Sequence, residues 1–590
     1  MELEKILVID PVTNVEETYK TKEVVYKSNV NNSTYKYTAD SQSDQNIIFN
    51  NITPPSLNTV IPRVLKVQYE LVVNSFANAV NVAPYAANSR VNGALANAAT
   101  ANMVLSDSPL QMCCTAIELR INGSSTSISP NDYIMIYSHL TDNEDLNRDQ
   151  STFPHQKDSN AFYNGAATAL AAYDFRSPFA PYYTNTTVPT RAGYSWDLIS
   201  SVAQGAATIG YNQYKVRIEE ELYLSPLVWG RLQDAVAGLS NINNLTLNFR
   251  LDNLQRAIRC VPVAANSTAL APNCVISVSC TQLAAVSASA TTPAMPLITA
   301  EKALLDLKYM TPDPVLAAKM PSVLAYDYSY IQSFITPFSG SASTSFPLQS
   351  IRLPSIPKRL FIFAKPSKRI LTGTALNTIP DIFLRMTQCQ ITFNNRINLL
   401  ANDTEFGLYQ RSRANGLQDS WTDWRYNTGS ILVIDVAKDL GLEADETSGQ
   451  ANKYSTLQCN VTLDMSPLTF FSSQQLAITD FDVYVLVESP GKAFITPSDC
   501  QFVLTGPSSA EVLSLTSGKN NVADYSDLIS KQVGGGAFGL GNLFNSGLRA
   551  IRNVDPQQAA NALGAAQNLM GTLGLGSGVA GGAMKHKRTY

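Results

Sequence analysis

The side chains that most often carry out catalysis are scarce in this sequence. It contains three histidines, His139, His155 and His586, and the last of these lies in a C-terminal tail. A Ser-His-Asp triad or a histidine-based metal site would be hard to assemble from so few. The glycine-rich segment 534–541 follows no expected strand and lacks a phosphate-binding lysine, and no Walker A, GxSxG or HExxH pattern occurs. We therefore expect a protein that is not an enzyme and that uses no metal or cofactor.

The chemistry that the tail does offer is that of a protease substrate. Two of its segments share the pattern Val-x-Gly-Gly-Ala, and both lie in sequence that a protease could bind in an extended form. The two glycines suit a narrow protease groove because they have no side chain to clash. Cleavage is predicted after Gly536 and Gly582, that is, before Ala537 and Ala583. Gly/Ala-rich sequence can also repeat short words by chance, so both explanations stay open.

The segment 537–582 that this cleavage would release contains an amphipathic stretch. Its apolar side chains recur at helical spacing and could bind a membrane surface: Leu540, Phe544, Leu548 and Ile551. Beyond it, Lys585, Lys587 and Arg588 form a short basic end. We predict that this end contacts nucleic acid or serves as an import signal, and a solvated end without a partner is the alternative.

The composition narrows the class of protein. Only 15% of the residues are charged and the net charge is −4, so the chain as a whole is not an electrostatic nucleic-acid binder. The low charge suggests that much of the surface is covered by other protein. Eight cysteines are scattered without zinc-site spacing, which favours buried reduced thiols. We expect no signal peptide, because the N-terminus is not charged and then apolar, and no membrane span, because no apolar run approaches about eighteen residues.

The elements that must position these residues are short alternating runs punctuated by Pro, Gly and Asn, a pattern that predicts an all-β protein. Several runs occur twice in the same order. The matched segments are 61–63 with 356–358, 117–123 with 389–395, the Ser-Pro-Leu phrase 222–227 with 463–468, and, more weakly, 245–249 with 481–485. We interpret them as two copies of one strand framework whose first copy has longer loops, since surface insertions cost little closure entropy.

This duplication predicts five parts along the chain. We expect an N-terminal arm at 1–40, a first β unit at 41–290, a linker at 291–319, a second β unit at 320–505 and a Gly/Ala-rich tail at 506–590.

An insertion at 144–214 in the first unit is dense in aromatic residues, among them Phe162, Tyr183, Tyr194 and Trp196. So many aromatic side chains in a polar loop require burial, either within the loop or against another subunit.

At this point the sequence resembles a known family. Two tandem eight-stranded β units, few charges, enlarged loops in the first unit and a glycine-rich tail are similar to the double jelly-roll major capsid proteins. The segments most similar to Polinton-like viruses, virophages and adintoviruses are 356–363, 381–384, 391–395, 421–424, and 225–227 through 238–243 to 247. They are strand-and-turn phrases, so their specificity is moderate.

The resemblance implies the fold and the function. The fold would be all-β, with two tandem jelly rolls. Homotrimers with six jelly rolls would form pseudo-hexagonal capsomers that tile the icosahedral shell of a double-stranded DNA virus. The chain would belong to the virion and assemble in the host nucleus or cytoplasm. Its partners would be other copies of itself, penton and minor capsid proteins, and viral DNA through the tail.

The resemblance also implies a maturation protease. The Gly-Gly-Ala words are similar to sites cut by adenovirus-type maturation cysteine proteases, which related viruses encode. They depart from that pattern at Val533 and Val579, where the family prefers a larger aliphatic residue.

Two other functions stay open at this point. A secreted or surface β-sandwich adhesin or lectin would need a signal peptide and calcium-binding acidic loops, and neither is seen in the sequence. A glycoside hydrolase on a β scaffold would need paired carboxylates, and nothing in one sequence pairs them.

Overall fold

A computed structural model describes just over half of the chain in detail. The described residues are 5–9, 21–25, 31–61, 65–77, 82–84, 91–92, 101–105, 108–140, 194–202, 210–222, 238–262, 275–289, 292–312, 324–339, 344–367, 383–394, 396–427, 429–441, 454–466, 468–470, 474–476 and 480–504. By packing, the chain divides into a larger unit, residues 1–12, 20–435 and 451–506, and a smaller unit formed by the rest. In the smaller unit the structure describes residues 436–441, which include helix α8 (Val436–Asp439).

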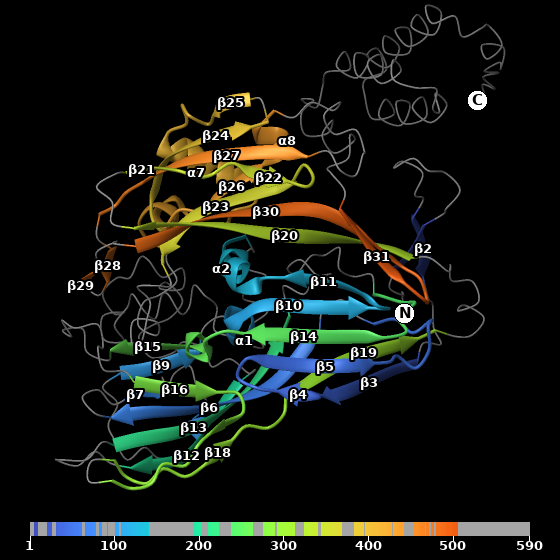
Figure 1. Ribbon diagram of the computed structural model, residues 1–590, viewed down its shortest axis with the longest axis vertical. Coiled ribbons are helices and arrows are strands. Elements are labelled where there is room, and N and C mark those ends of the chain that lie inside the picture. The colour runs from blue at the N-terminus through green and yellow to red at the C-terminus, as the bar shows by residue number, and fades with distance from the viewer. Residues whose placement is uncertain are drawn as a thin grey trace, which may run out of the picture. The chain divides into compact units, whose positions relative to one another are not determined.

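The first half of the larger unit contains two antiparallel β-sheets (Figure 1). One has the order β3 (Asn31–Thr38), β19 (Leu304–Thr311), β6 (Lys66–Ala77), β13 (Gly210–Glu221), and it continues through β12 (Tyr194–Val202) to β8 (Val91–Asn92), which pairs in parallel. The other has the order β11 (Ser124–Ile128), β10 (Cys114–Ile121), β14 (Leu245–Leu251), β5 (Asn46–Ile52), β4 (Ser41–Gln42).

The second half repeats this arrangement with shorter connections. One sheet has the order β20 (Leu324–Ser339), β30 (Asp480–Ile495), β23 (Arg359–Pro366), β26 (Leu432–Asp435). In the other, β21 (Ser345–Pro347) and β22 (Ile351–Leu353) both pair with β27 (Ser455–Leu463), which is followed by β24 (Met386–Phe393) and β25 (Arg396–Leu399).

The strand order identifies each half as a jelly roll. The eight framework strands of the first jelly roll are, in chain order, β3, β5, β6, β10, β11, β13, β14 and β19; those of the second are β20, β21 together with β22, β23, β24, β25, β26, β27 and β30. In each set the first strand pairs with the eighth, the eighth with the third and the third with the sixth. The second strand pairs with the seventh, the seventh with the fourth and the fourth with the fifth. Two sheets wound in this way form the jelly roll, which protects its strand edges by packing sheet on sheet. The predicted all-β fold with two tandem jelly rolls is confirmed.

Alternating burial explains why these segments are strands. In β27 every second residue from Ser455 to Leu463 is buried, which is the pattern of a strand with one face on a core. In the second jelly roll Phe346 of one sheet packs edge-to-face on Phe481 of the other, with ring centroids 4.8 Å apart. Burying a side chain of this size contributes about 1.5–3 kcal/mol, so these alternating faces supply the cores.

Two helices occupy the same place in the two jelly rolls, between the fifth and sixth strands. They are α2 (Pro130–Leu140) in the first and α7 (Glu405–Ala414) in the second. The helix α7 starts at Thr404, whose hydroxyl accepts a hydrogen bond from the backbone N–H of Gly407, an N-cap that satisfies a donor of the first turn.

The remaining elements are β1 (Lys5–Ile9), β2 (Thr21–Val25), β7 (Val82–Pro84), β9 (Ala101–Leu105), β15 (Ile258–Pro262), β16 (Val275–Ser279), β17 (Gln282–Leu283), β18 (Ile298–Thr299), β28 (Leu468–Phe470), β29 (Gln474–Leu476), β31 (Cys500–Leu504), α1 (Pro109–Cys113) and the short helices η4 (Leu254–Ala257) and η5 (Asp423–Asn427).

Two of the predicted sequence matches join strands that do not correspond. The Ser-Pro-Leu phrase 222–227 begins at the end of β13, the sixth strand, whereas its copy 463–468 begins at the end of β27, the seventh. The weaker match of 245–249 with 481–485 joins the seventh strand to the eighth. Both matches are wrong. The same few residue types favour turns, so similar short sequences occur at the ends of strands that do not correspond.

Two other predicted matches are confirmed. Ile61 and Ile356 precede the third strands, β6 and β23, and Asn122 and Asn394 follow the fourth strands, β10 and β24.

The predicted arm and linker both contribute strands to the first jelly roll. The strand β3 lies within the predicted arm 1–40, and β19 lies within the predicted linker 291–319. They pair with each other over their whole length, and β19 also pairs with β6. The strand β19 buries Leu305, Leu307 and Tyr309, so this part of the predicted linker belongs to the core of the first jelly roll.

Part of the aromatic insertion 144–214 also belongs to the sheet. The strand β12 and the start of β13 lie in it, and Trp196 packs edge-to-face on Tyr214 inside the core. The rest of the insertion lies outside the described residues.

The six cysteines whose side chains the structure describes are all buried, as predicted. Within the described ranges there is no helix long and apolar enough to cross a membrane. The same ranges contain no cluster of three or more His, Cys, Asp or Glu side chains that could hold a metal ion.

Candidate functional site at the junction of the jelly rolls

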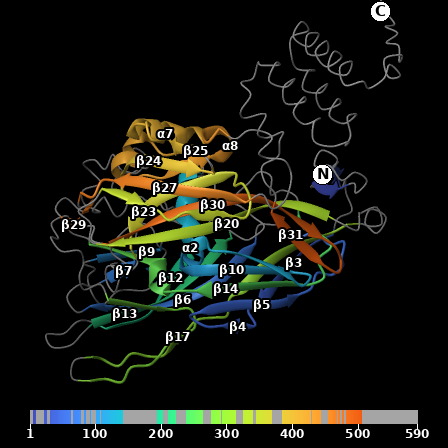
Figure 2. The same ribbon diagram turned by 45° about the horizontal axis from the view of Figure 1, so that its top comes forward.

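The candidate site is the junction where the first jelly roll packs against the second. Helix α2 of the first jelly roll lies next to β23 of the second (Figure 1 and Figure 2). Tyr133 on this helix and Phe361 on β23 are both fully buried, with ring centroids 5.6 Å apart at 70°. An edge-to-face pair of this kind contributes about 0.5–1.5 kcal/mol beyond the area that it buries.

The end of α2 carries a buried histidine that reaches the second jelly roll. The Nδ1 of His139 lies 2.9 Å from Oδ1 and 2.8 Å from Oδ2 of Asp419, and both side chains are fully buried. An ionised carboxylate can only accept hydrogen bonds, so this geometry assigns a proton to Nδ1. The Nε2 of His139 is buried without a partner in the described part of the chain. The backbone N–H of Gln418 also donates to the carbonyl of His139, at 2.8 Å.

A second, partly buried charge pair supports this junction from within the second jelly roll. The Nε of Arg359 donates to Oε2 of Glu488 at 2.5 Å, and the hydroxyl of Ser329 donates to Oε1 of the same carboxylate at 3.1 Å. Burial alone would lower the pKa of Arg359, but the Glu488 carboxylate and nearby Tyr133 hold it above its ordinary value. Arg359 therefore stays charged beside the contact between Tyr133 and Phe361. Its ion pair with Glu488 holds the first residue of β23 in place.

The turn between β10 and β11 makes the next contact between the two jelly rolls. Asn122 has a φ of 47°, a left-handed conformation that asparagine tolerates better than most residues. Its Nδ2 donates to the carbonyl of Thr496, at 2.6 Å, in the second jelly roll. Beside it, the hydroxyl of Ser124 donates to Asp499 at 3.4 Å, and the backbone N–H of Ser240 donates to the hydroxyl of Tyr326 at 3.0 Å.

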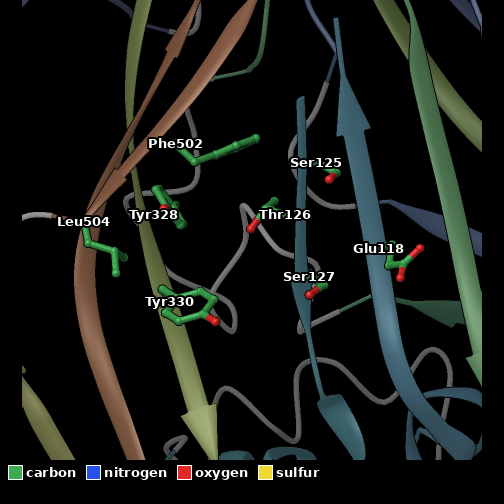
Figure 3. Close-up of a pocket in the computed structure, with 8 residues that line it drawn as sticks. All are labelled: Glu118, Ser125, Thr126, Ser127, Tyr328, Tyr330, Phe502 and Leu504. Atoms are coloured by element: carbon green, nitrogen blue, oxygen red, sulfur yellow. The ribbon is translucent and has the colours of Figure 1, made fainter. Parts of the chain in front are cut away.

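A cavity of about 290 Å³ lies along the same junction (Figure 3). One wall comes from β10 and β11 of the first jelly roll, and the other from β20 and β31 of the second. The lining residues are Glu118, Ser125, Thr126, Ser127, Tyr328, Tyr330, Phe502 and Leu504. Burial raises the pKa of Tyr328 to about 12, so its hydroxyl is neutral at physiological pH.

Gly491 makes room for one wall of this cavity. A Cβ on this residue would lie 2.6 Å from the Tyr328 ring, so only glycine lets that ring cross β30 towards Phe502, which it meets with centroids 5.7 Å apart.

These groups hold two sandwiches in one arrangement and do not converge on a reacting atom. The polar groups pair with one another across the junction, and the apolar ones fill it. Separating a buried pair such as His139 and Asp419 is costly, so these pairs favour one packing arrangement over others. The junction therefore supplies rigidity, which a building block of a larger assembly requires.

The structure leaves the predicted tail sites untested. Outside the described residues lie Gly536, Ala537, Gly582 and Ala583, Leu540, Phe544, Leu548 and Ile551, and Lys585, Lys587 and Arg588. Neither Asp419 nor a role for His139 was predicted from the sequence. The sequence offered one indication of the junction. The repeated segment 117–123 contains the turn at Asn122, and this turn contacts the second jelly roll.

Comparison with known proteins identifies the same two halves. The family model described as "Sputnik virophage major capsid protein 1st domain" matches residues 1–292, and "Major capsid protein V20 C-terminal domain" matches residues 329–483. The curated protein "Putative capsid protein V20" of the Sputnik virophage is 24% identical over 347 residues, 55% of this chain and 52% of that protein. The chain thus matches about half the length of that curated relative.

Two solved structures share the fold over most of their length. The 3.5 Å cryo-EM structure of the Sputnik virophage matches with a TM-score of 0.61 and 20% identity, covering 88% of this chain and 96% of that one. The mavirus major capsid protein matches with a TM-score of 0.57 and 12% identity, covering 87% of this chain and 98% of that one. The strand order and the two family models, which between them cover both jelly rolls, lead to one conclusion: the chain belongs to the double jelly-roll major capsid proteins of the virophage type.

Proposed function

We propose that this chain is the major capsid protein of a double-stranded DNA virus and forms the shell of its virion. The observation that carries the proposal is the repeated jelly roll with a buried junction. A chain that holds two similar sandwiches in a fixed arrangement is suited to tiling, because each copy presents two similar blocks to its neighbours. The role is structural rather than catalytic.

The assembly we propose is a homotrimer whose six jelly rolls form a pseudo-hexagonal capsomer. Homo-oligomers with closed symmetry are the common form of soluble assemblies, and head-to-tail contacts close into rings when the rotation allows it. Capsomers of this outline tile an icosahedral shell, with penton and minor capsid proteins at the vertices and seams. The enlarged loops of the first jelly roll, including the aromatic insertion 144–214, contribute to the contacts between copies.

The tail has a separate proposed role inside the particle. Cleavage after Gly536 and Gly582 by a maturation cysteine protease would free a peptide that binds a membrane or lines the shell. Lys585, Lys587 and Arg588 would contact the viral DNA, or act earlier as an import signal. Three cations give a weak and salt-sensitive interaction.

Negative-stain electron microscopy of the purified full chain tests the proposed function. We expect pseudo-hexagonal trimers or closed shells, and the same sample at lower concentration serves as the control for mass-action dissociation. Monodisperse monomers at all concentrations would contradict the proposal and would favour an adhesin or lectin instead. Hydrolysis of a glycan panel by the same preparation would instead support a glycoside hydrolase.

A further inference from the structure

Two buried cysteines lie in contact on neighbouring strands of the second jelly roll. Cys389 on β24 and Cys459 on β27 are 1% and 2% exposed, and their Sγ atoms are 3.6 Å apart. The two strands pair directly (Figure 1), with Cys389 opposite Val461 and Cys459 opposite Ile391. The cysteines are thus diagonal neighbours, which lie further apart than directly opposite residues. Contact between the sulfurs therefore means that both side chains lean towards each other.

A disulfide bond between these two residues requires only a small approach of the sulfurs. The bond is about 2.05 Å long, so the two Sγ atoms must come about 1.5 Å closer than their present 3.6 Å. Rotation of both side chains shares this movement, and the strands that carry them are already held side by side by their backbone pairing. The fold therefore brings the two thiols together before any bond is made.

The closed fold does not activate either thiol. The hydrogen bond with Cys459 and burial raise the pKa of Cys389 well above its ordinary value, and the thiolate is the form that reacts. The pair therefore reacts slowly, when the sheet opens locally. The fold has a place for such an opening, because Cys459 lies opposite the interruption between the short strands β21 and β22. There the backbone N–H of Leu348 donates to the carbonyl of Cys459 at 2.8 Å.

The bond would enclose the part of the second jelly roll that reaches the first. Cys389 and Cys459 are 70 positions apart in the sequence. The chain between them carries α7, β26 and Asp419, which pairs with His139. A cross-link that closes a long loop restricts the unfolded chain and so stabilises the folded one. Closing this bond would make the second jelly roll, and with it the junction, harder to unfold.

We propose that Cys389 and Cys459 form a disulfide whose state follows the redox surroundings of the chain. The pair remains as two thiols inside the reducing host cell and closes when a peroxide acts on it outside. The inference rests on the proposed function only for this change of surroundings, since a virion leaves the cell in which its protein is made.

The reaction with hydrogen peroxide conserves atoms and electrons. The thiolate of one cysteine attacks the peroxide, its sulfur becomes a sulfenic acid, and one water molecule is released once the thiol proton is counted. The neighbouring thiol then attacks the sulfenic sulfur, forms the S–S bond and releases the oxygen as a second water molecule. The two sulfurs lose two electrons in all, and the peroxide gains them.

Alkylation and peptide mapping of the wild-type chain test the bond itself. The purified full chain is reduced, freed of reductant and incubated in its folded state with or without hydrogen peroxide. It is then denatured in iodoacetamide and digested without reductant. We expect all eight thiols to be alkylated in the untreated sample, and the peptides that contain Cys389 and Cys459 to be linked in the treated one. The absence of this link after treatment would overturn the inference.

Melting temperatures of the same samples test the consequence of the bond. Peroxide should raise the melting temperature of the wild type by at least about 2 °C, and should not raise that of Cys389→Ala, which lacks one sulfur. Cys280→Ala is the matched control, because Cys280 is also 1% exposed and its thiol donates to the carbonyl of Ser43 instead. This control should rise like the wild type. An equal rise in Cys389→Ala would overturn the stabilising role.

Alkylation at the moment of cell lysis tests the dependence on surroundings. Chain from producing cells should be fully alkylated, whereas chain from released particles should carry the link. A link already present at lysis would overturn the redox control. These results are separate from the proposed function, because the bond is measured on the chain whether or not it assembles. Purified chain that stays monomeric would contradict the proposed function and leave the peptide map to decide the bond.

Discussion

Removing the His139 imidazole should weaken the junction between the two jelly rolls. His139→Ala would leave the Asp419 carboxylate buried, without the Nδ1–H donor that now lies 2.8–2.9 Å from its two oxygens. Both side chains are fully buried. Breaking a buried pair by removing one partner costs about 3–5 kcal/mol, because the remaining buried charge loses that compensation. The milder Asp419→Asn variant keeps an acceptor for Nδ1 and should cost about 1–2 kcal/mol.

Urea unfolding of the three proteins measures these costs, with hydrogen exchange at the Gln418 amide as the local probe. That amide donates to the carbonyl of His139, so its protection should fall in His139→Ala before the chain unfolds globally. The control is Ser124→Ala, which removes a longer, exposed hydrogen bond across the same junction and should cost less than about 0.5 kcal/mol. If His139→Ala unfolds at the same urea concentration as this control, the buried pair does not hold the junction.

Four further predictions concern other parts of the chain. Burial raises the pKa of Glu220 in spite of its hydrogen bonds from Gln111, Leu110 and Tyr69. The native state therefore holds that proton more tightly, stability falls as the pH rises from the ordinary glutamate pKa to the raised one, and Glu220→Gln should flatten this part of a pH–stability curve. Gly429→Ala should cost at least about 2 kcal/mol in urea unfolding, because φ is +91° and a Cβ would lie 1.9 Å from the Phe383 carbonyl oxygen. Deleting 160–190, which spares β12, should leave a folded chain that sediments as a monomer, and normal trimers would contradict the role of the insertion. Intact-mass spectrometry of mature particles should find chains ending at Gly536, and only full-length chains would refute the cleavage.

Much of the fold could be predicted from the sequence because its determinants are local. Alternating apolar residues define a strand wherever one face meets a core, and most strong runs, such as 359–364 and 458–465, form strands. The left-handed turn at Asn122 and Asn394 was marked by the residue type itself, since few other residues adopt that conformation without strain. A repeated turn with a steric requirement was therefore a sound guide to the duplication.

Repeated sequence segments without such a steric requirement did not identify corresponding strands. The Ser-Pro-Leu phrase only ends a strand, and any strand can end that way, so its two copies marked the sixth strand in one jelly roll and the seventh in the other. The strand β19 lies in the predicted linker because membership of a sheet depends on the strands with which a segment pairs. Its partners, β3 and β6, are far away in the sequence.

The sequence by itself determined an all-β chain built of two related units, because the period of the apolar residues and the chemistry of the turns act over a few neighbours. Only the tertiary structure decided how the two units join. His139 and Asp419 are 280 positions apart, and the sequence around either residue does not indicate that the two pair. Contacts between distant segments depend on how whole sheets pack, and that packing is a property of the folded chain rather than of any stretch of it.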